Sequence, residues 1–262
     1  MHISHPPIVA SLPAAPLLPY ISQYWLSLDN RDERYSITPD GSVDVVFAIG
    51  AAGFRAEAFG TTTRRSDVQL DVGHHYFGIR FRPGQSRHFL DAKAAELTNT
   101  VCSVEGVFSL SASALGGFLF DDSLFARVDA ALLQHLKRRP ARHSRIDDVL
   151  RHIETSPSAS PVSDLASIFC KSRRQFERAF VEAVGLPPKL FTEIVRFQRA
   201  AALLANPALS LTSIAAALGY ADQSHFTHEF VRFHGQPPSR ARQHGAFLQA
   251  QDLPTRNNAG FL

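Results

Sequence analysis

Two segments of this 262-residue sequence repeat one pattern, LASIFCKSRRQFERAFVEAVGLPP at residues 165–188 and IAAALGYADQSHFTHEFVRFHGQPP at residues 214–238. In the second half of the pattern the two copies are offset by 50 residues, so that Phe180 matches Phe230. In the first half the offset is 49, because one extra residue follows Gly219. A turn accepts such an insertion more easily than a helix does. We infer that one structural unit occurs twice in the chain.

Each copy predicts two short helices joined by a tight turn. Short polar side chains accept hydrogen bonds from the free N–H groups that begin a helix. We therefore expect Ser163 and Thr212 to cap the first helices, and Ser172 and Asp222 to cap the second helices, near 172–184 and 222–234. Glycine easily adopts the left-handed conformation at a helix end, and each second helix stops at one. The expected buried stripes are Phe176, Phe180 and Val184 in the first copy, and Phe226, Phe230 and Phe233 in the second. This arrangement is a helix-turn-helix, whose second helix enters the major groove of DNA.

A longer helix, from about 188 to 205, is expected between the two copies. Its apolar residues at helical spacing are Leu190, Ile194, Phe197, Ala201 and Leu204. Eighteen residues of helix span roughly 27 Å. Such a helix can hold two recognition helices about one DNA turn apart, ~34 Å, for two successive major grooves.

Polar side chains stand early on the second helix of both copies, away from the phenylalanine stripe. An ordinary helical bundle with an internal duplication is the alternative, but it has no need of these residues twice. Arginine recognises guanine and glutamine recognises adenine in the major groove. The candidate DNA-binding residues are Arg173, Arg174, Glu177, Arg178, Gln223, Ser224, His225 and His228.

The run from Gly219 to Phe230, followed by Gly-Gln-Pro-Pro at 235–238, resembles the signature of AraC-type transcription regulators. Residues 165–188 resemble the first helix-turn-helix of the same family. The resemblance covers about residues 143–245 and implies a seven-helix DNA-binding domain, usually fused to a domain for effector sensing or dimerisation. By position, it implies base contacts by Arg174, Glu177, Arg178, Gln223, Ser224, His225 and His228.

Three positions depart from the family pattern. Cys170 stands at a turn where the family commonly has glycine, so this residue is strained if its φ is positive. Lys171 stands where an apolar residue is usual. His228 stands where arginine is common, and a neutral imidazole attracts phosphate less strongly than a guanidinium. We expect the first unit to dominate base discrimination.

The region before the repeat is expected to be rich in β-structure. Aromatic and β-branched runs predict strands at 20–26, 42–49 and 75–81, and turn residues separate them. From Leu110 the pattern becomes helical, and one helix ends at Pro140. The expected fold class is α+β, with an N-terminal β-rich, barrel-like domain before an all-α C-terminal domain that holds two helix-turn-helix units. We expect the domains at 1–140 and 141–250, with a C-terminal tail at 251–262.

Three segments of this region, 38–47, 78–84 and 94–98, resemble an uncharacterised N-terminal domain found on many AraC-type regulators. The resemblance implies a small, barrel-like sensing module. Arg80 and Arg82 are candidates for binding the carboxylate of an effector, and Trp25 for lining its pocket. The favoured alternative pairs the arginines with Asp40, Asp44 or another acid, and aromatic residues on strands are usually core. Pro39-Asp40-Gly41 predicts a hairpin turn.

Composition sets broader limits. The net charge is +3, but residues 1–140 hold 13 Lys and Arg against 14 Asp and Glu, whereas residues 141–262 hold 14 against 10. Cys102 and Cys170 belong to no metal or redox spacing, which indicates a reduced, cytoplasmic protein. No segment reaches the roughly 20 apolar residues of a membrane span. We expect no catalytic residues, no metal and no cofactor.

The expected partner is double-stranded DNA at a promoter or operator. RNA polymerase, an unknown small-molecule effector and a second copy in a homodimer are further expectations, and a membrane is not. One alternative is a barrel-type metal-dependent enzyme that carries a DNA-binding tail, with chemistry near His74, His75 or His88. Another is an N-terminal domain that serves only dimerisation or protein interaction and binds no small ligand. Adjacent residues of a strand point to opposite faces, which disfavours a metal site that uses both His74 and His75.

Overall fold

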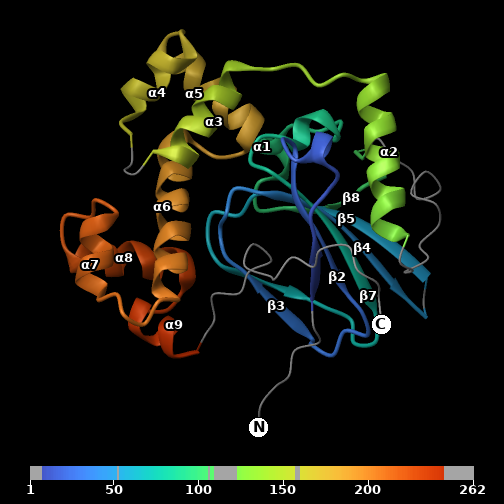
Figure 1. Ribbon diagram of the computed structural model, residues 1–262, viewed down its shortest axis with the longest axis horizontal. Coiled ribbons are helices and arrows are strands. Elements are labelled where there is room, and N and C mark those ends of the chain that lie inside the picture. The colour runs from blue at the N-terminus through green and yellow to red at the C-terminus, as the bar shows by residue number, and fades with distance from the viewer. Residues whose placement is uncertain (1–7, 52, 106, 109–122, 157–159, 245–262) are drawn as a thin grey trace.

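The computed structural model describes residues 8–51, 53–105, 107–108, 123–156 and 160–244. The expected tail at 251–262 and the start of the helical pattern at Leu110 lie outside these residues. A β-rich part and a helical part lie side by side, and an extended segment joins helix α2 (Leu124–Arg138) of the first to helix α3 (Arg145–Thr155) of the second (Figure 1).

The β-rich part contains two antiparallel sheets. The larger has six strands in the order β1-β2-β7-β4-β5-β8, and the smaller pairs β3 with β6. Strands β2, β4 and β7 confirm the three strands that the sequence predicts. The elements are β1 (Val9–Ser11), η1 (Ala15–Leu17), β2 (Ile21–Ser27), β3 (Arg34–Ile37), β4 (Val43–Gly50), β5 (Gly53–Phe59), β6 (Ser66–Gln69), β7 (His75–Phe81), η2 (Ser86–His88), α1 (Ala94–Leu97) and β8 (Val101–Ser103).

One face of the large sheet forms a hydrophobic core with α2. Phe47 of β4 lies opposite Phe77 of β7, and both are buried. Alternate residues of a strand share a face, so the sheet presents a continuous apolar surface. Helix α2 packs Val128 and Leu132 into the same cluster. The hydroxyl of Tyr24 donates to Asp129 Oδ1 at 2.8 Å and fixes the helix on the sheet.

Two expectations about this part need correction. The large sheet is open, because β1 and β8 form its two edges in the described residues and do not pair with each other. The segment Pro39-Asp40-Gly41 is not a hairpin turn, because it joins β3 and β4, which belong to different sheets. Asp40 Oδ1 accepts from the backbone N–H of Ser42 at 2.8 Å, which makes a local turn. Turn chemistry identifies a turn, but the partner of each strand depends on distant residues.

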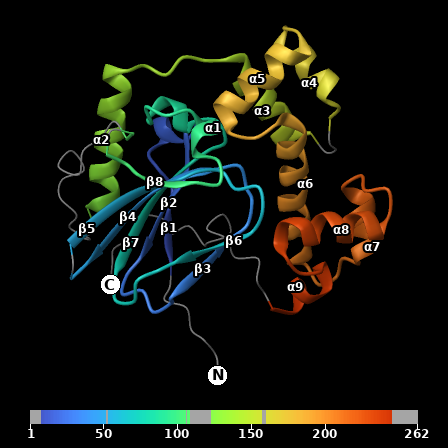
Figure 2. The same ribbon diagram turned by 180° about the vertical axis from the view of Figure 1, so that it is seen from behind.

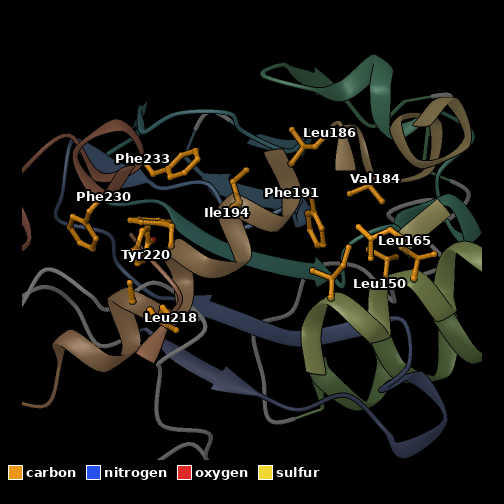
Figure 3. Close-up of a cluster of buried hydrophobic side chains, with 14 of the residues drawn as sticks. Leu150, Leu165, Val184, Leu186, Phe191, Ile194, Leu218, Tyr220, Phe230 and Phe233 are labelled. Atoms are coloured by element: carbon orange, nitrogen blue, oxygen red, sulfur yellow. The ribbon is translucent and has the colours of Figure 1, made fainter. Parts of the chain in front are cut away.

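The helical part is built around α6 (Pro188–Leu204), with one helix-turn-helix at each end (Figures 1 and 2). Figure 3 shows Leu165 and Val184 near one end of α6, and Tyr220 and Phe230 near the other, within one buried cluster. Where the structure describes the chain, no helix is long and apolar enough to span a bilayer. The remaining helices are α4 (Val162–Phe169), α5 (Arg173–Val184), α7 (Leu211–Ala217), α8 (Gln223–His234) and α9 (Pro238–His244).

The capping predictions are half right. The side chains of Ser172 and Asp222 accept from backbone N–H groups and cap α5 and α8, as expected. The expectation for Ser163 and Thr212 is wrong, since α4 begins after Pro161 and α7 begins after Ser210. Each first helix starts a residue or two earlier than the pattern indicates, as is common for helix ends.

Candidate DNA-binding surface

The first helix-turn-helix unit consists of α4, a turn at Cys170 and α5. Cys170 has φ 56° and ψ 37°, which is the left-handed region that the missing glycine would favour. Ser172 Oγ accepts from the N–H of Gln175, and the Gln175 side chain accepts from the N–H of Ser172. This capping box starts α5 without help from a distant residue. The turn is therefore strained at Cys170 and stabilised two residues later, at Ser172.

The exposed face of α5 is cationic at its beginning. Arg173 Nε donates to Glu177 Oε1 at 2.8 Å, one helical turn away. Arg174 and Arg178 are exposed, and neither forms an ion pair within the described part of the chain. The first turn of α5 holds no acidic residue.

Arg173 and Arg174 lie in the first turn of α5, where a positive charge is unfavourable for the stability of the free helix. The amino-terminal end of a helix carries a partial positive charge, and cations there cost a few tenths of a kcal/mol or more. A phosphate or a guanine edge placed at this end reverses the effect, because it brings a negative charge or acceptors to both the helix and the arginines. The arrangement is suited to binding and not to folding.

The second unit consists of α7, a turn at Gly219 and α8. Gly219 has φ 71°, and Asp222 Oδ1 accepts from the N–H of His225 at 2.7 Å. Gln223 Oε1 accepts from Thr212 Oγ1 at 2.8 Å, which ties the start of α8 to α7. Ser224 and His228 are exposed beside Gln223. The first turns of α8 thus present amide, hydroxyl and imidazole groups and no arginine.

A buried polar network anchors the second unit and has no counterpart in the sequence predictions. Glu229 lies on the inner side of α8, 8% exposed. Its carboxylate accepts from Arg196 Nε of α6 at 3.0 Å and from the hydroxyl of Tyr220 at 2.7 Å. The Arg196 guanidinium also lies 4.3 Å from the centre of the Tyr220 ring. The sequence did contain a signal for this network, since Glu229 follows the buried Phe226 by three residues and so lies on the same helix face. A carboxylate on an apolar face requires a partner.

The charges of this network support one another. Burial lowers the pKa of Arg196, but the hydrogen bond and charge of Glu229 outweigh it and raise that pKa overall. Burial raises the pKa of Tyr220, and its hydrogen bond to Glu229 raises it further. Arg196 therefore stays cationic and Tyr220 stays a neutral donor. In the first copy the position equivalent to Glu229 is Ala179, which has no polar side chain.

Arg80 and Trp25, two of the three candidate ligand residues, meet at one acidic side chain. Arg80 Nε donates to Asp44 Oδ1 at 3.0 Å, and Nη1 donates to Asp40 Oδ2 at 2.9 Å. Trp25 Nε1 lies 3.4 Å from Asp44 Oδ1, with its indole over Gly78. Burial lowers the pKa of Arg80, but Asp44 and Asp40 outweigh it, so the guanidinium is charged and paired. The favoured alternative, in which Arg80 pairs with Asp40 or Asp44, is therefore confirmed for Arg80. Ligand binding by Arg80 and Trp25 stays a prediction.

Arg82 lies apart from that cluster, at a cavity of about 360 Å³ between the two parts of the molecule. Its Nε donates to the backbone oxygen of Leu18 at 2.7 Å. The cavity is also lined by Tyr20, His88, Arg142 and Glu154, among others. Burial raises the pKa of Glu154, and Arg82 opposes this shift. Of the three candidate ligand residues, only Arg82 borders this cavity.

The histidines that suggested a metal site have other surroundings. His75 Nδ1 accepts from the N–H of Asp29 at 2.8 Å. His88 packs against the ring of Tyr20, and burial lowers its pKa to about 4. Among the described residues, His, Cys, Asp and Glu side chains form no group of three that is arranged to hold a metal.

Comparison with known families divides the chain at the same two regions. The family described as "Helix-turn-helix domain" matches residues 165–244, which contain both units. The family described as "Domain of unknown function (DUF6597)" matches residues 10–103, which contain β2 to β8 and all of β1 except its first residue. The two matches together cover most of the described residues.

Relatives match over parts of their length. An uncharacterized HTH-type transcriptional regulator of Haemophilus influenzae is 34% identical over 82 residues, which are 31% of this chain and 28% of the relative. The RCS-specific HTH-type transcriptional activator RclR of Escherichia coli is 33% identical over 102 residues, 38% of this chain and 36% of the relative. The chain thus spans about a third of the length of these curated relatives.

Among solved structures, a transcriptional regulator from Chromobacterium violaceum, described as an AraC-type DNA-binding domain-containing protein, is 25% identical with a TM-score of 0.36. The match covers 39% of this chain and 92% of that one. The specific signature at 219–238, the family match and the named relatives agree on one assignment. The chain therefore carries an AraC-type helix-turn-helix domain at residues 165–244, preceded by a domain of the DUF6597 family.

Proposed function

We propose that this protein is a sequence-specific DNA-binding transcription regulator that inserts α5 and α8 into adjacent major grooves. The exposed polar beginnings of both recognition helices carry the proposal. Arg174 and Arg178 of α5 are exposed without an ion pair within the described residues, and Arg174 lies in the first turn, where a cation is unfavourable in the free protein. Such residues are suited to phosphate oxygens and base edges.

The roles differ along each helix. Arg174, Glu177 and Arg178 are proposed as the base-reading residues of α5, and Gln223, Ser224, His225 and His228 as those of α8. Arg173 is proposed to position α5 on phosphate, since its ion pair with Glu177 holds its side chain along the helix. Helix α6, with 17 residues, spans about 26 Å between the units. This length is compatible with two grooves about one turn apart.

The β-rich domain is proposed to regulate DNA binding. The supporting observation is the cavity at Arg82, which lies where the β-rich part meets α3 and the segment that precedes it. A small-molecule effector in this cavity would contact both parts. RNA polymerase and a second copy of the chain are further proposed partners. We retain the division into 1–140 and 141–250 as the proposed domains.

Selection of bound sequences from a random pool of double-stranded DNA tests the function directly. The full chain is expected to enrich a site with two conserved blocks, and its affinity is expected to fall steeply with salt because phosphate contacts release counterions. The variant Arg174→Ala/Arg178→Ala is the comparison, with Arg64→Ala as the control for loss of an exposed arginine elsewhere. Recovery of unrelated sequences by the wild-type protein would contradict the proposal.

A further inference from the structure

The β-rich part of the molecule contacts the ends of both recognition helices. Helices α5 and α8 end at Gly185 and Gly235, which are equivalent in the repeat and have φ 84° and 83°. One segment, Gly60 to Arg65 between β5 and β6, reaches both ends. The last carbonyl groups of a helix have no partner inside the helix and accept hydrogen bonds from elsewhere.

The contact at the end of α5 is close. Thr98 Oγ1 donates to the backbone oxygen of Gly185 at 2.7 Å, and Thr61 Oγ1 lies 3.4 Å from Thr98 Oγ1. A Cβ atom on Gly185 would lie 2.6 Å from Thr61 Oγ1 and 2.8 Å from the backbone oxygen of Ala94. Such distances are shorter than van der Waals contact, so the two parts approach here only because residue 185 is a glycine.

The contact at the end of α8 depends on one arginine. Arg65 Nη1 donates to the backbone oxygen of His234 at 3.3 Å, at the helix end whose partial negative charge favours a cation. Arg65 Nη2 donates to Ser36 Oγ at 2.7 Å, and Ser36 Oγ donates to Asp67 Oδ1 at 2.6 Å. The small sheet of β3 and β6 thus holds Arg65 in place against α8.

The helix between the units also rests on the β-rich part. Gln198 of α6 donates through Nε2 to the backbone oxygen of Pro39. Phe191 of α6 lies against Gly41, where an added Cβ would approach its ring to 2.5 Å. Asp40, between these two contacts, is held by Arg80. The β-rich part therefore touches α5, α6 and α8.

We propose that the segment Gly60–Arg65, together with Thr98, fixes the distance and angle between the two recognition helices and so determines the spacing of the DNA half-sites that the protein accepts. The proposal rests on the proposed DNA-binding function. Thr61, Arg65 and Thr98 are positioning residues in it, because they contact helix ends and not DNA.

The placement of these contacts is consistent with bound DNA. The candidate base-reading residues lie in the first turns of α5 and α8, whereas the β-rich part contacts the last residues. A helix of 12 residues separates its two ends by about 18 Å. The contacts of Thr61, Arg65 and Thr98 therefore leave the first turns of α5 and α8 accessible to DNA. Each added base pair moves a half-site by about 3.4 Å along the duplex and rotates it by about 35°. A rigid pair of helices tolerates little of either change.

The test uses the full chain and DNA in which two selected half-sites are separated by the preferred spacer or by one base pair more or less. The variant Arg65→Ala removes the donor at the end of α8. Arg64→Ala is the matched control, since Arg64 is the exposed neighbour without an ion pair in the described structure. Arg65→Lys retains a donor and a positive charge. Thr98→Val releases the other cap and replaces Arg65→Ala if that variant fails to fold.

Coupling between two sites on one protein is typically worth 5–150-fold in affinity. We expect the discrimination between the preferred spacer and its neighbours to fall by about tenfold in Arg65→Ala and in Thr98→Val. Affinity for a single half-site is expected to stay at the wild-type level, Arg64→Ala to keep the wild-type spacer preference, and Arg65→Lys to restore most of it. The proposed positioning role is overturned if the spacer preference is unchanged in both Arg65→Ala and Thr98→Val. It is also overturned if these variants lose affinity equally for single half-sites. If the wild-type protein shows no sequence-specific binding with any spacer, the DNA-binding function itself is contradicted.

Discussion

The two helix-turn-helix units share one backbone plan but achieve rigidity and recognition by different means. The first unit has a strained cysteine in its turn, a local capping box and exposed arginines. The second has glycine in its turn, a single aspartate cap and a buried network that joins Glu229 to Arg196 and Tyr220. The first concentrates charge at the proposed DNA surface. The second concentrates charge inside, where it attaches α8 to α6.

In this duplicated fold the central core residues are more alike between the two copies than the polar residues are. Phe176 and Phe180 are repeated as Phe226 and Phe230, and all four are fully buried. The polar positions around them have no such repetition. We conclude that the units share the central phenylalanines of their cores and differ in the polar residues that contribute to binding and stability.

The largest expected effect is on the stability of the second unit. Glu229→Gln leaves the largely buried Arg196 without its counter-charge, and breaking a buried ion pair from one side costs about 3 kcal/mol. Denaturant unfolding of the full chain measures this loss. The control is Glu193→Gln, which breaks the pair with the more exposed Arg232 and is expected to cost less than about 1 kcal/mol. Equal losses in the two variants would mean that the network stabilises no more than a surface pair.

The next effect concerns recognition by the first unit. Arg174→Ala is expected to weaken binding by about 1–3 kcal/mol and to relax the preference at one base pair. Competition binding with single base-pair substitutions in the selected site measures both quantities. A uniform loss over all sequences would assign Arg174 to a phosphate instead of a base.

A smaller effect is expected in the two turns. Cys170→Gly removes a left-handed non-glycine residue and is expected to stabilise the protein by about 1 kcal/mol, whereas Gly219→Ala introduces one and is expected to destabilise it by a similar amount. The space around Gly219 is open within the described structure, so the alanine variant reports backbone strain alone. Thermal unfolding compares them, with Cys170→Ala as the control that removes only the thiol. Destabilisation by Cys170→Gly would show that the cysteine side chain, and not backbone strain, governs this turn.

The smallest effect is expected at His228 of the second unit. His228→Arg adds a permanent cation on the exposed side of α8 and is expected to tighten binding by less than about 1 kcal/mol while steepening the salt dependence by about one counterion. Affinities at several salt concentrations measure the slope. An unchanged slope would place residue 228 away from the DNA backbone.

Local patterns predicted the helical half of the fold well. The phenylalanine spacing and the glycine stops located α5, α6 and α8 to within a residue or two, because helices form from contacts between residues close in sequence. The six-stranded order and the β3–β6 sheet were not predictable, since alternation shows a strand but not its partner.

In the candidate site, too, local features were predictable from the sequence and contacts between distant residues were not. Exposure of Arg174 and Arg178 follows from helical periodicity, and the structure agrees with it. The contacts of Thr98 with Gly185 and of Arg65 with His234 join residues 87 and 169 positions apart, and no local signal records them. The partner of Arg80 was equally undetermined, because the sequence alone allowed either a ligand or an acidic residue such as Asp44.

Helices α5 and α8 are proposed to read two different grooves of one DNA site. The most direct measurement compares base-pair preferences along the selected site for the wild-type protein, Arg174→Ala and Gln223→Ala. Each variant is expected to lose discrimination in only one of two blocks, with block centres about one helical turn, roughly 10–10.5 base pairs, apart. Loss of discrimination at the same base pairs in both variants would contradict the proposal.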